Sequence, residues 1–351
     1  MSRTVGAAGA ATRTGRRRVL PVVALLAVLM MLAGCGTTPA EQTPAAAANT
    51  VPPFPTPSEA TELPQTSATA TAPPPATCAD PTASLRPVTT AADGSPLPQP
   101  NVDAIRARGR LIVGLDTGSN PFSFRDPRSS ELVGFDVDIA SEIARQLFGD
   151  PRQLEFRIVS SAERERALVD GLVDVVVKTM SITCERRDQV DFSTVYYQAH
   201  QRVLVRNDSG VRGGADINGI ADLHDRTVCV AGGTTSLTRI QQIVPTARIM
   251  RVTEWADCLV MMQQNQIDAV STDDTLLAGM AAQDPYLAIV GESLSEEPYG
   301  VGIPPGHDDV VRLVNAALER IREDGTWNRI YDRWLTVLGP SPGPPTPRYV
   351  D

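Results

Sequence analysis

The sequence predicts an α/β protein made of two units, each a mostly parallel sheet flanked by helices. Short β-branched stretches alternate with amphipathic helical stretches over residues 101–197, and the same alternation starts again after residue 198. The chain then turns back near residues 295–299. We therefore expect the last helical stretches, within residues 310–334, to complete the first unit.

The first 34 residues have the composition of a secretion signal. They contain five Arg and no acid, and the apolar stretch at residues 19–33 is too short for an ordinary membrane span. The stretch ends in Leu-Ala-Gly-Cys35, which resembles the bacterial lipobox, in which the Cys carries a lipid such as palmitate. The alternative is a plain secretory signal with a chance Cys. We expect a bacterial extracytoplasmic protein that Cys35 anchors to the cell membrane.

The regions on either side of the two units are rich in proline and small residues. Residues 35–100 are mainly Pro, Ala, Thr and Ser, which cannot bury enough surface to offset the entropy of ordering, so we predict a disordered tether. The Pro-rich residues 339–351 predict a flexible tail. Removal of residues 1–34 shifts the formal charge from −9 to −14, which argues against nucleic acid as a partner.

Four cysteines remain if Cys35 carries lipid, an even number for an oxidising compartment. Three pairings are possible. We favour Cys229–Cys258, because both lie in the second unit, and this leaves Cys78–Cys184; the alternative is four free thiols. The sequence has no CxxC or HExxH pattern, so we expect neither a metal nor a cofactor.

The first unit follows from the periodicity of its apolar residues. Ile139, Ile143 and Leu147 recur every four residues, which predicts an amphipathic helix. The other predicted elements are a helix near 102–106, strands at 110–115 and 154–159, and a helix at 162–170. The loop at residues 116–120 follows a strand, at the edge where open α/β sheets bind ligands.

The stretch from Val173 to Arg187 carries the strongest functional signal. A β-branched strand at residues 173–177 passes through small polar residues, Thr179 and Ser181, into a helix with Thr183 as N-cap. A strand end that leads into a helix start exposes backbone N–H groups, which bind anions. Arg186 adds a planar fork that holds a carboxylate. The alternative for Arg186 is a surface helix residue.

The second unit repeats this pattern. Its predicted strands are residues 202–205, 227–231, 249–252, 267–270 and 287–290, and its helices begin near 237 and 256. The strand at 227–231 ends in a Gly-Gly-Thr-Thr turn, which lacks the Gly-Lys-Ser/Thr of a nucleotide site.

Lys178 is the only lysine in a chain with 32 basic residues. A compact ammonium at a strand end fits a confined space better than a guanidinium does, so we expect Lys178 to face a ligand. The alternative is a pair with a structural acid such as Asp174.

Several motifs together resemble the polar-amino-acid solute-binding proteins of ABC importers (family 3), over about residues 101–338. The motifs are Gly134-Phe-Asp-Val-Asp-Ile, Ile182-Thr-Cys-Glu-Arg, Val190-Asp-Phe-Ser, Asp268-Ala-Val-Ser-Thr-Asp and Gly325-Thr-Trp. The resemblance implies a two-lobed periplasmic-binding-protein type 2 fold, in which two crossovers form a hinge. Lobe 1 would be residues 101–197 and 298–338, and lobe 2 residues 198–297. The actinobacterial glutamate-binding lipoproteins resemble this chain most and share the Cys229 and Cys258 positions.

The resemblance also implies a set of ligand-binding residues. Arg186 would hold the α-carboxylate of an amino acid, with backbone N–H groups near Ser181 and in the Thr234–Thr235 turn. Asp273 would accept the α-ammonium, assisted by Asp116. Ser161 and Arg164 would face the ligand side chain, although the charge run around Arg164 is more typical of a solvated helix face. The chain departs from the pattern at Ser119, Lys178 and Thr272, which leaves the side-chain specificity open.

The charge balance suggests the ligand. Three candidate cations, Arg164, Lys178 and Arg186, face one or two acids, so a ligand with two carboxylates fits best. We predict an extracytoplasmic, monomeric receptor that captures glutamate or aspartate and delivers it to an ABC importer permease, without catalysis. The alternatives are a glutamine or asparagine receptor, an amino-acid sensor that signals to a membrane protein, and a periplasmic dehydratase on the same fold.

Overall fold

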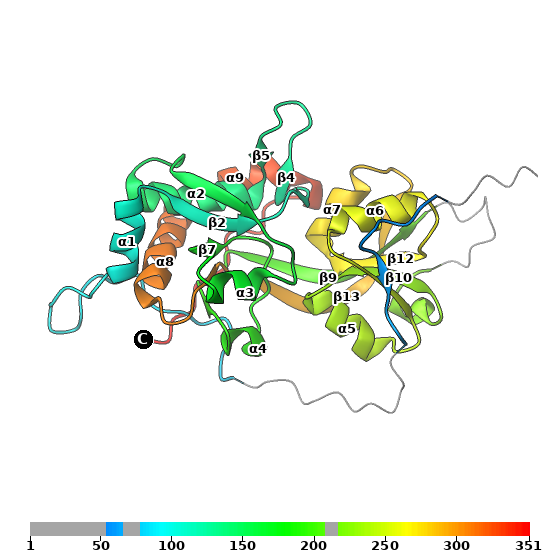
Figure 1. Cartoon of the computed structure of the whole chain (residues 1–351), viewed down its shortest axis with the longest axis horizontal. Helices are drawn as coiled ribbons and strands as arrows, with labels where there is room; N and C mark the ends of the chain where they lie inside the picture. Colours follow the sequence, from blue (N-terminus) through cyan, green and yellow to red (C-terminus); the bar gives the residue numbers. More distant parts are fainter. Residues whose placement is uncertain (1–53, 66–77, 208–216) are drawn as a thin grey trace, which may run out of the picture. The chain divides into compact units, whose positions relative to one another are not determined.

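The computed structural model describes residues 54–65, 78–207 and 217–351. Cys35 and the predicted signal lie outside these residues. Two sheets form two lobes, and the long strands β9 (Tyr197–Arg206) and β13 (Leu287–Tyr299) run between them (Figure 1).

The sheet of lobe 1 has the strand order β6-β2-β7-β14-β8. Its parallel centre consists of β6 (Leu154–Ile158), β2 (Leu111–Leu115) and β7 (Val175–Val176). Two short antiparallel strands, β14 (Gly302–Ile303) and β8 (Asp191–Phe192), complete it. A small separate sheet contains β3 (Gly118–Ser119), β4 (Ser123–Arg125) and β5 (Leu132–Val133).

The helices of lobe 1 bury the apolar stripes that the sequence predicted. In α2 (Phe135–Phe148) the side chains of Ile139, Ile143 and Leu147 are buried, and this helix packs beside α8 (Asp308–Glu323). The remaining helices of this lobe are α1 (Pro100–Arg108), α3 (Arg164–Val169), α4 (Cys184–Arg187), α9 (Thr326–Trp334) and the 3₁₀ turn η2 (Thr336–Leu338).

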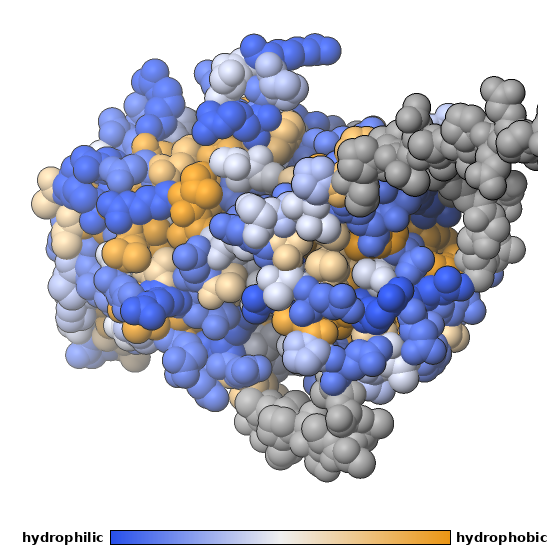
Figure 2. All heavy atoms as spheres, turned by 45° about the vertical axis from the view of Figure 1, so that its right-hand side comes forward, coloured by the Kyte–Doolittle hydropathy of each residue, from blue (hydrophilic) through white to orange (hydrophobic). Residues whose placement is uncertain are grey.

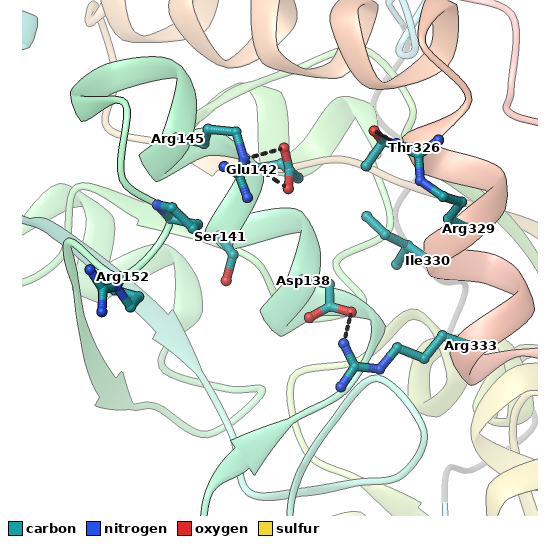
Figure 3. A pocket seen from close by; sticks show the side chains of 10 residues that line it. Asp138, Ser141, Glu142, Arg145, Arg152, Thr326, Arg329, Ile330 and Arg333 are labelled. Carbon is teal, nitrogen blue, oxygen red and sulfur yellow. Dashed lines mark hydrogen bonds and ion pairs between the residues drawn. The ribbon is translucent and has the colours of Figure 1, made fainter.

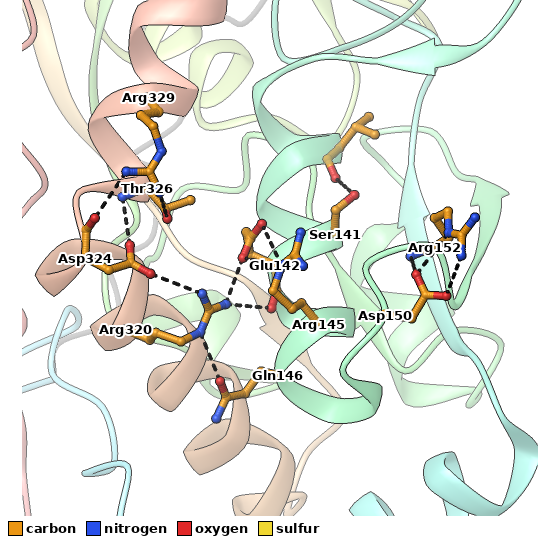
Figure 4. A network of polar contacts seen from close by, with 11 residues as sticks. Ser141, Glu142, Arg145, Gln146, Asp150, Arg152, Arg320, Asp324, Thr326 and Arg329 are labelled. Carbon is orange, nitrogen blue, oxygen red and sulfur yellow. Dashed lines mark hydrogen bonds and ion pairs between the residues drawn. The ribbon is translucent and has the colours of Figure 1, made fainter.

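A polar network holds α2, α8 and α9 together at the surface (Figure 4). Arg320 on α8 donates to the Glu142 carboxylate at 2.8 Å and to the Gln146 side chain, both on α2. It also pairs with Asp324, next to α9. Because these groups are partly exposed, the network orients the helices more than it stabilises them.

The sheet of lobe 2 has the order β1-β11-β10-β12-β9-β13. Strands β11 (Arg248–Val252), β10 (Thr227–Ala231) and β12 (Ala269–Asp273) are parallel. Crossover strand β9 pairs with β12, and β13 pairs with β9, both in antiparallel direction. The sheets are therefore mixed, with parallel centres, where the sequence predicted mostly parallel ones. The helices are α5 (Thr235–Ile243), α6 (Trp255–Gln263), α7 (Asp274–Ala281) and the turn η1 (Ile220–Leu223).

Two flanking segments that the sequence predicted as disordered pack on the lobes. Strand β1 (Thr61–Glu62) pairs with the free edge of β11. Residues 78–100 and the C-terminal residues lie on lobe 1, where the Ser84 and Val350 backbones form a hydrogen bond of 3.1 Å. The tether and the tail predicted from composition therefore do not extend through these parts. These segments bury little apolar surface, but unpaired backbone groups of the lobes form hydrogen bonds with them and a disulfide ties one of them down, and this offsets the entropy cost of ordering.

The structure contains two disulfides, Cys78–Cys184 and Cys229–Cys258, with Cα–Cα distances of 5.6 and 5.7 Å. The first joins the segment before lobe 1 to α4, and the second joins β10 to α6 in the core of lobe 2. On the face drawn in Figure 2, hydrophobic residues form small areas separated by hydrophilic ones.

Candidate functional site

A cavity lies between the lobes, at the carboxyl ends of their parallel strands. Its volume is about 10 Å³, which is room for about one water molecule. Lobe 1 contributes Ser161, Arg164, Thr179, Ser181 and Arg186; lobe 2 contributes Thr234, Thr235, Ser236, Trp255, Thr272, Asp273 and Leu276. An amino acid could enter only after the lobes separate, so this arrangement is a closed one.

Arg186 lies on α4, whose N-cap Thr183 accepts the Arg186 backbone N–H at 3.2 Å, as the sequence predicted. Its guanidinium donates to the Ser181 carbonyl at 2.7 Å and pairs with the half-exposed Glu165 carboxylate at 2.9 Å. A third donor, Nη2, reaches the Gly233 carbonyl of lobe 2 at 3.1 Å. The fork therefore faces across the cavity.

Arg164 is 3% exposed, not on a solvated helix face. It donates only to backbone carbonyls, namely those of Ser161, Lys178, Thr179 and Gly233. Within the described residues, no carboxylate lies within ion-pair distance of it. Burial, together with the positive charge of Arg186, lowers the pKa of Arg164 to about 9. A buried guanidinium without a counter-ion is costly, and an anion in the cavity would remove that cost.

The Gly233 carbonyl receives donors from both arginines at once. Gly233 has a φ of +69°, and a Cβ at this position would lie 2.5 Å from the Ala162 Cα of lobe 1. Only glycine permits this approach without a shift of the backbone. The turn that the resemblance implies for binding the ligand carboxylate is therefore also a contact between the lobes.

Asp273 faces the arginines from the end of β12. Tyr299 on crossover strand β13 donates to its Oδ2, and its Oδ1 is buried without a hydrogen-bond partner. Burial raises the pKa of Asp273 well above its usual value, and the nearby Glu297 carboxylate adds to the increase. A buried acceptor without a donor marks a position where a ligand N–H or ammonium would be stabilised.

The N-terminus of α5 forms the floor of the cavity on the lobe 2 side. Thr234 caps the helix by accepting the Leu237 N–H at 3.1 Å. The Thr235 hydroxyl donates to the buried Glu297 carboxylate at 2.7 Å. The first N–H groups of the helix therefore point toward the cavity, which suits a carboxylate.

Lys178 and Asp116 do not line the cavity, in contrast to the sequence-based prediction. They form a buried ion pair, in which Ser119 and Ser123 also donate to the Asp116 carboxylate at 2.7 and 2.8 Å. Burial alone would raise the pKa of Asp116, but Lys178 and the hydroxyls outweigh it and lower the pKa. Lys178 thus pairs with a structural acid, which is Asp116 and not Asp174.

Asp136 holds the backbone of Thr179, one of the residues that line the cavity. Its buried carboxylate accepts the Tyr196 hydroxyl at 2.8 Å and the Thr179 N–H at 2.9 Å. Thr179 has a φ of +38°, an uncommon value for a β-branched residue, and the bond to Asp136 helps to hold it there.

Four lining residues were not among the predicted ligand-binding residues, namely Ser236, Trp255, Thr272 and Leu276, although Thr272 was noted as a departure from the family pattern. Trp255 follows strand β11 by three positions, so the strand-end rule that selected residues 116–120 could have selected it. Leu276 gave no such signal, because it lies inside the apolar helix α7.

A larger pocket lies on the outside of lobe 1, between α2 and α9 (Figure 3). Its volume is about 400 Å³, and four arginines line it: Arg145, Arg152, Arg329 and Arg333. Asp138 and Glu142 lie among them and pair with Arg333 and Arg145. The pocket is formed by one lobe alone and its charges are mostly paired, so we do not place the ligand there.

The described residues contain no cluster of three or more His, Cys, Asp or Glu that could bind a metal ion. None of the helices formed by these same residues has the length and apolarity needed to cross a bilayer.

Two lobes that close over a cavity at their strand ends, joined by two crossover strands, define a binding protein of the periplasmic type 2 fold. The sequence profile of the bacterial extracellular solute-binding proteins, family 3, matches residues 111–337. The chain belongs to this family.

Relatives of known name share about a third of the residues. The glutamine-binding protein of Geobacillus stearothermophilus is 38% identical over 57% of this chain and 75% of its own length. The ABC transporter glutamine-binding protein GlnH of Bacillus subtilis is 33% identical over 66% of this chain and 83% of its own length. The glutamate-binding protein GluB of Corynebacterium efficiens is 30% identical over 63% of this chain and 77% of its own length.

Solved structures agree with the fold. The P235GK mutant of ArgBP from T. maritima has a TM-score of 0.62 and 31% identity, over 67% of this chain and 99% of its own. The ancestral amino-acid-binding protein AncCDT-1, a precursor of cyclohexadienyl dehydratase, has a TM-score of 0.60 and 33% identity, over 67% and 99%.

Proposed function

We propose that this protein captures an acidic amino acid, glutamate or aspartate, outside the cytoplasm and delivers it to an ABC importer. Relatives named for glutamine, glutamate and arginine binding support an amino acid as the ligand, and the Bacillus relative is named as part of an ABC transporter. The ligand-binding residues would be those that line the interlobe cavity.

The observation that carries the proposal is the charge of the cavity wall. Two cations, Arg164 and Arg186, and one acid, Asp273, are its titratable lining residues, so the cations outnumber the acid. The α-carboxylate would bind Arg186 and the N-terminus of α5, and the ammonium would bind the free Asp273 Oδ1. A second carboxylate would then pair with Arg164, the buried cation that has only carbonyl partners. Arg164 would thus face the ligand side chain, as the resemblance implies, and Lys178 would have no contact with the ligand.

A neutral ligand, glutamine or asparagine, is the second candidate. Arg186 already pairs with Glu165, and if this pair persists on binding, the site has no excess charge. The two glutamine-binding relatives are also more similar to this chain than the glutamate-binding one. Glu165 is half-exposed, so water weakens its effect on the cavity, and we give the acidic ligand precedence.

Titration calorimetry with glutamate, aspartate, glutamine, asparagine and arginine tests the proposal. We expect the acidic amino acids to bind at least tenfold more tightly than their amides. Arg164→Gln should remove this preference, whereas Arg145→Gln, on the outside of lobe 1, should retain it. Tighter binding of an amide or of arginine to the unmodified protein would exclude an acidic specificity.

We also propose that Cys35 carries a lipid that anchors the protein to the membrane, and that the protein acts as a monomer. Transport and sensing both use ligand capture by closure. Uptake of labelled glutamate that is lost on gene deletion would support transport, whereas a changed signalling output with normal uptake would support sensing. Recovery of the amino acid chemically unchanged after incubation would exclude the dehydratase alternative.

A further inference from the structure

The helix that carries Arg186 is too short to hold itself in place. Helix α4 contains four residues, Cys184 to Arg187, so it forms barely one turn. Isolated helices of this length are not stable in water. The orientation of Arg186 toward the cavity must therefore depend on what α4 is attached to.

The segment of residues 78–86, which we call the N-terminal arm, provides two attachments. The first is covalent: Cys184, the first residue of α4, forms a disulfide with Cys78. The second is polar: Arg187, the last residue of α4, donates to the carbonyls of Pro81 and Ala83. The first and last residues of α4, on either side of Arg186, are thus bound to the same arm.

The arm itself is fixed to the body of lobe 1. The Ser84 hydroxyl donates to the Phe192 carbonyl at 2.8 Å, and the buried Asn315 side chain donates to the Ser84 hydroxyl and the Leu85 carbonyl. On the outer side, Asp80 pairs with Arg348 of the C-terminal segment at 2.8 Å. The arm therefore connects α4 to α8 and to the C-terminus.

We propose that the N-terminal arm is a positioning element for the ligand site: Cys78–Cys184 and Arg187 hold α4 so that Arg186 faces the cavity. This inference rests on the proposed function, in which Arg186 binds the ligand carboxylate. The Arg187 guanidinium points into the arm and Arg186 into the cavity, so neighbouring arginines have separate tasks.

The two disulfides of the described chain differ in access as well as in position. Cys78 is exposed, whereas Cys229 and Cys258 are completely buried in lobe 2. An exposed disulfide is reduced more readily than a buried one. A mild dithiol reductant should therefore open Cys78–Cys184 first, converting both sulfurs to thiols while the dithiol is oxidised to its own disulfide.

The matched pair of disulfides provides the main experiment. Cys78→Ser/Cys184→Ser should weaken glutamate or aspartate binding at least tenfold, measured at a temperature where circular dichroism shows the variant folded. Cys229→Ser/Cys258→Ser, folded under the same conditions, should change binding less than twofold. Arg187→Met, which keeps the disulfide, should weaken binding about threefold. Equal affinities for the Cys78/Cys184 variant and the unmodified protein would overturn the proposal.

A double-mutant cycle separates positioning from general stability. In an Arg186→Lys background, removal of Cys78–Cys184 should cost little further affinity, because the group that the arm positions is already altered. Additive losses would show that the arm acts on the site by another route and would overturn the proposal. In the unmodified protein, mild dithiol treatment that leaves Cys229–Cys258 intact should reproduce the loss seen with the serine variant.

A ligand-independent measurement keeps the two proposals distinguishable. Hydrogen exchange of the Gln189 and Val190 amides, which donate to the Arg186 carbonyl, should become faster in the Cys78→Ser/Cys184→Ser variant. Failure of the unmodified protein to bind any acidic amino acid would exclude the proposed function alone. Unchanged exchange at these amides would exclude the positioning role alone.

Discussion

Two groups of buried charges lie at or near the interlobe cavity, and they differ in how their charge is compensated. Lys178 and Asp116 pair with each other, and two serine hydroxyls donate hydrogen bonds to the Asp116 carboxylate. Arg164 donates hydrogen bonds only to backbone carbonyls. Asp273, across the cavity, has one carboxylate oxygen without a hydrogen-bond partner. A compensated pair supports the fold, whereas uncompensated charges that face a common space are suited to a ligand.

The largest expected effect concerns the compensated pair. Lys178→Met should lower the free energy of unfolding by about 3–5 kcal/mol, because it leaves the Asp116 carboxylate buried and unpaired. Lys178→Met/Asp116→Asn should recover most of this loss. Urea denaturation measures both. A single variant as stable as the unmodified protein would show that the pair is not a structural element.

The second prediction concerns the carboxylate fork. Arg186→Ala should weaken ligand binding by about 3 kcal/mol or more, over a hundredfold, because a desolvated charge loses its partner. Calorimetry measures this change, and the exposed Arg145→Ala provides the control. Full binding by Arg186→Ala would place the site elsewhere.

A smaller effect is expected at the opposite wall. Asp273→Asn should weaken binding by about 2 kcal/mol, roughly 30-fold, because the ligand ammonium loses a charged acceptor. Retention of ligand affinity would contradict this role.

The same variant should change the pH dependence of the free protein. The raised pKa of Asp273 means that the folded state keeps this proton after the unfolded chain has lost it. The free energy of unfolding therefore decreases as pH rises above the usual pKa of 3.8, and Asp273→Asn should lack this contribution. Thermal unfolding at pH 4 to 8 measures the difference between the two proteins.

The smallest effect tests closure. A Cβ at Gly279 of α7 would lie 1.8 Å from the Asn120 carbonyl oxygen of lobe 1, so Gly279→Ala should hinder closure and weaken binding about tenfold. At Gly118 a Cβ would meet Ala256 at 3.4 Å, an ordinary contact, so Gly118→Ala should bind normally. Equal affinities for both variants would argue against this contact as a part of the closed form.

Local patterns were enough to predict much of the fold. The stripe of Ile139, Ile143 and Leu147 specified α2, and Thr183 specified the start of α4, because both signals depend on neighbours within a turn or two. Eight of the ten predicted ligand-binding residues line the interlobe cavity, and most of these were predicted from the family resemblance and not from local patterns.

The errors arose where partners are distant in the sequence. Lys178 was separated from its Asp116 partner by 62 residues, and no local pattern indicates which acid a buried lysine meets. Strand β1 has a composition typical of disorder, and its order depends on the open edge of β11, which the sequence does not display. Trp255 and Leu276 line the cavity from lobe 2, and no local pattern indicates which residues of one lobe face the other.

The Gly233 carbonyl bears on the affinity for the ligand. It occupies one donor of each arginine in the closed form, and these are donors that an incoming carboxylate would need. These bonds join the two lobes, so they are absent when the lobes separate to admit an amino acid, and on closure the carbonyl and a ligand carboxylate compete for the same donors. The empty closed form is therefore stabilised by bonds that the liganded form lacks, which lowers the net affinity for the ligand.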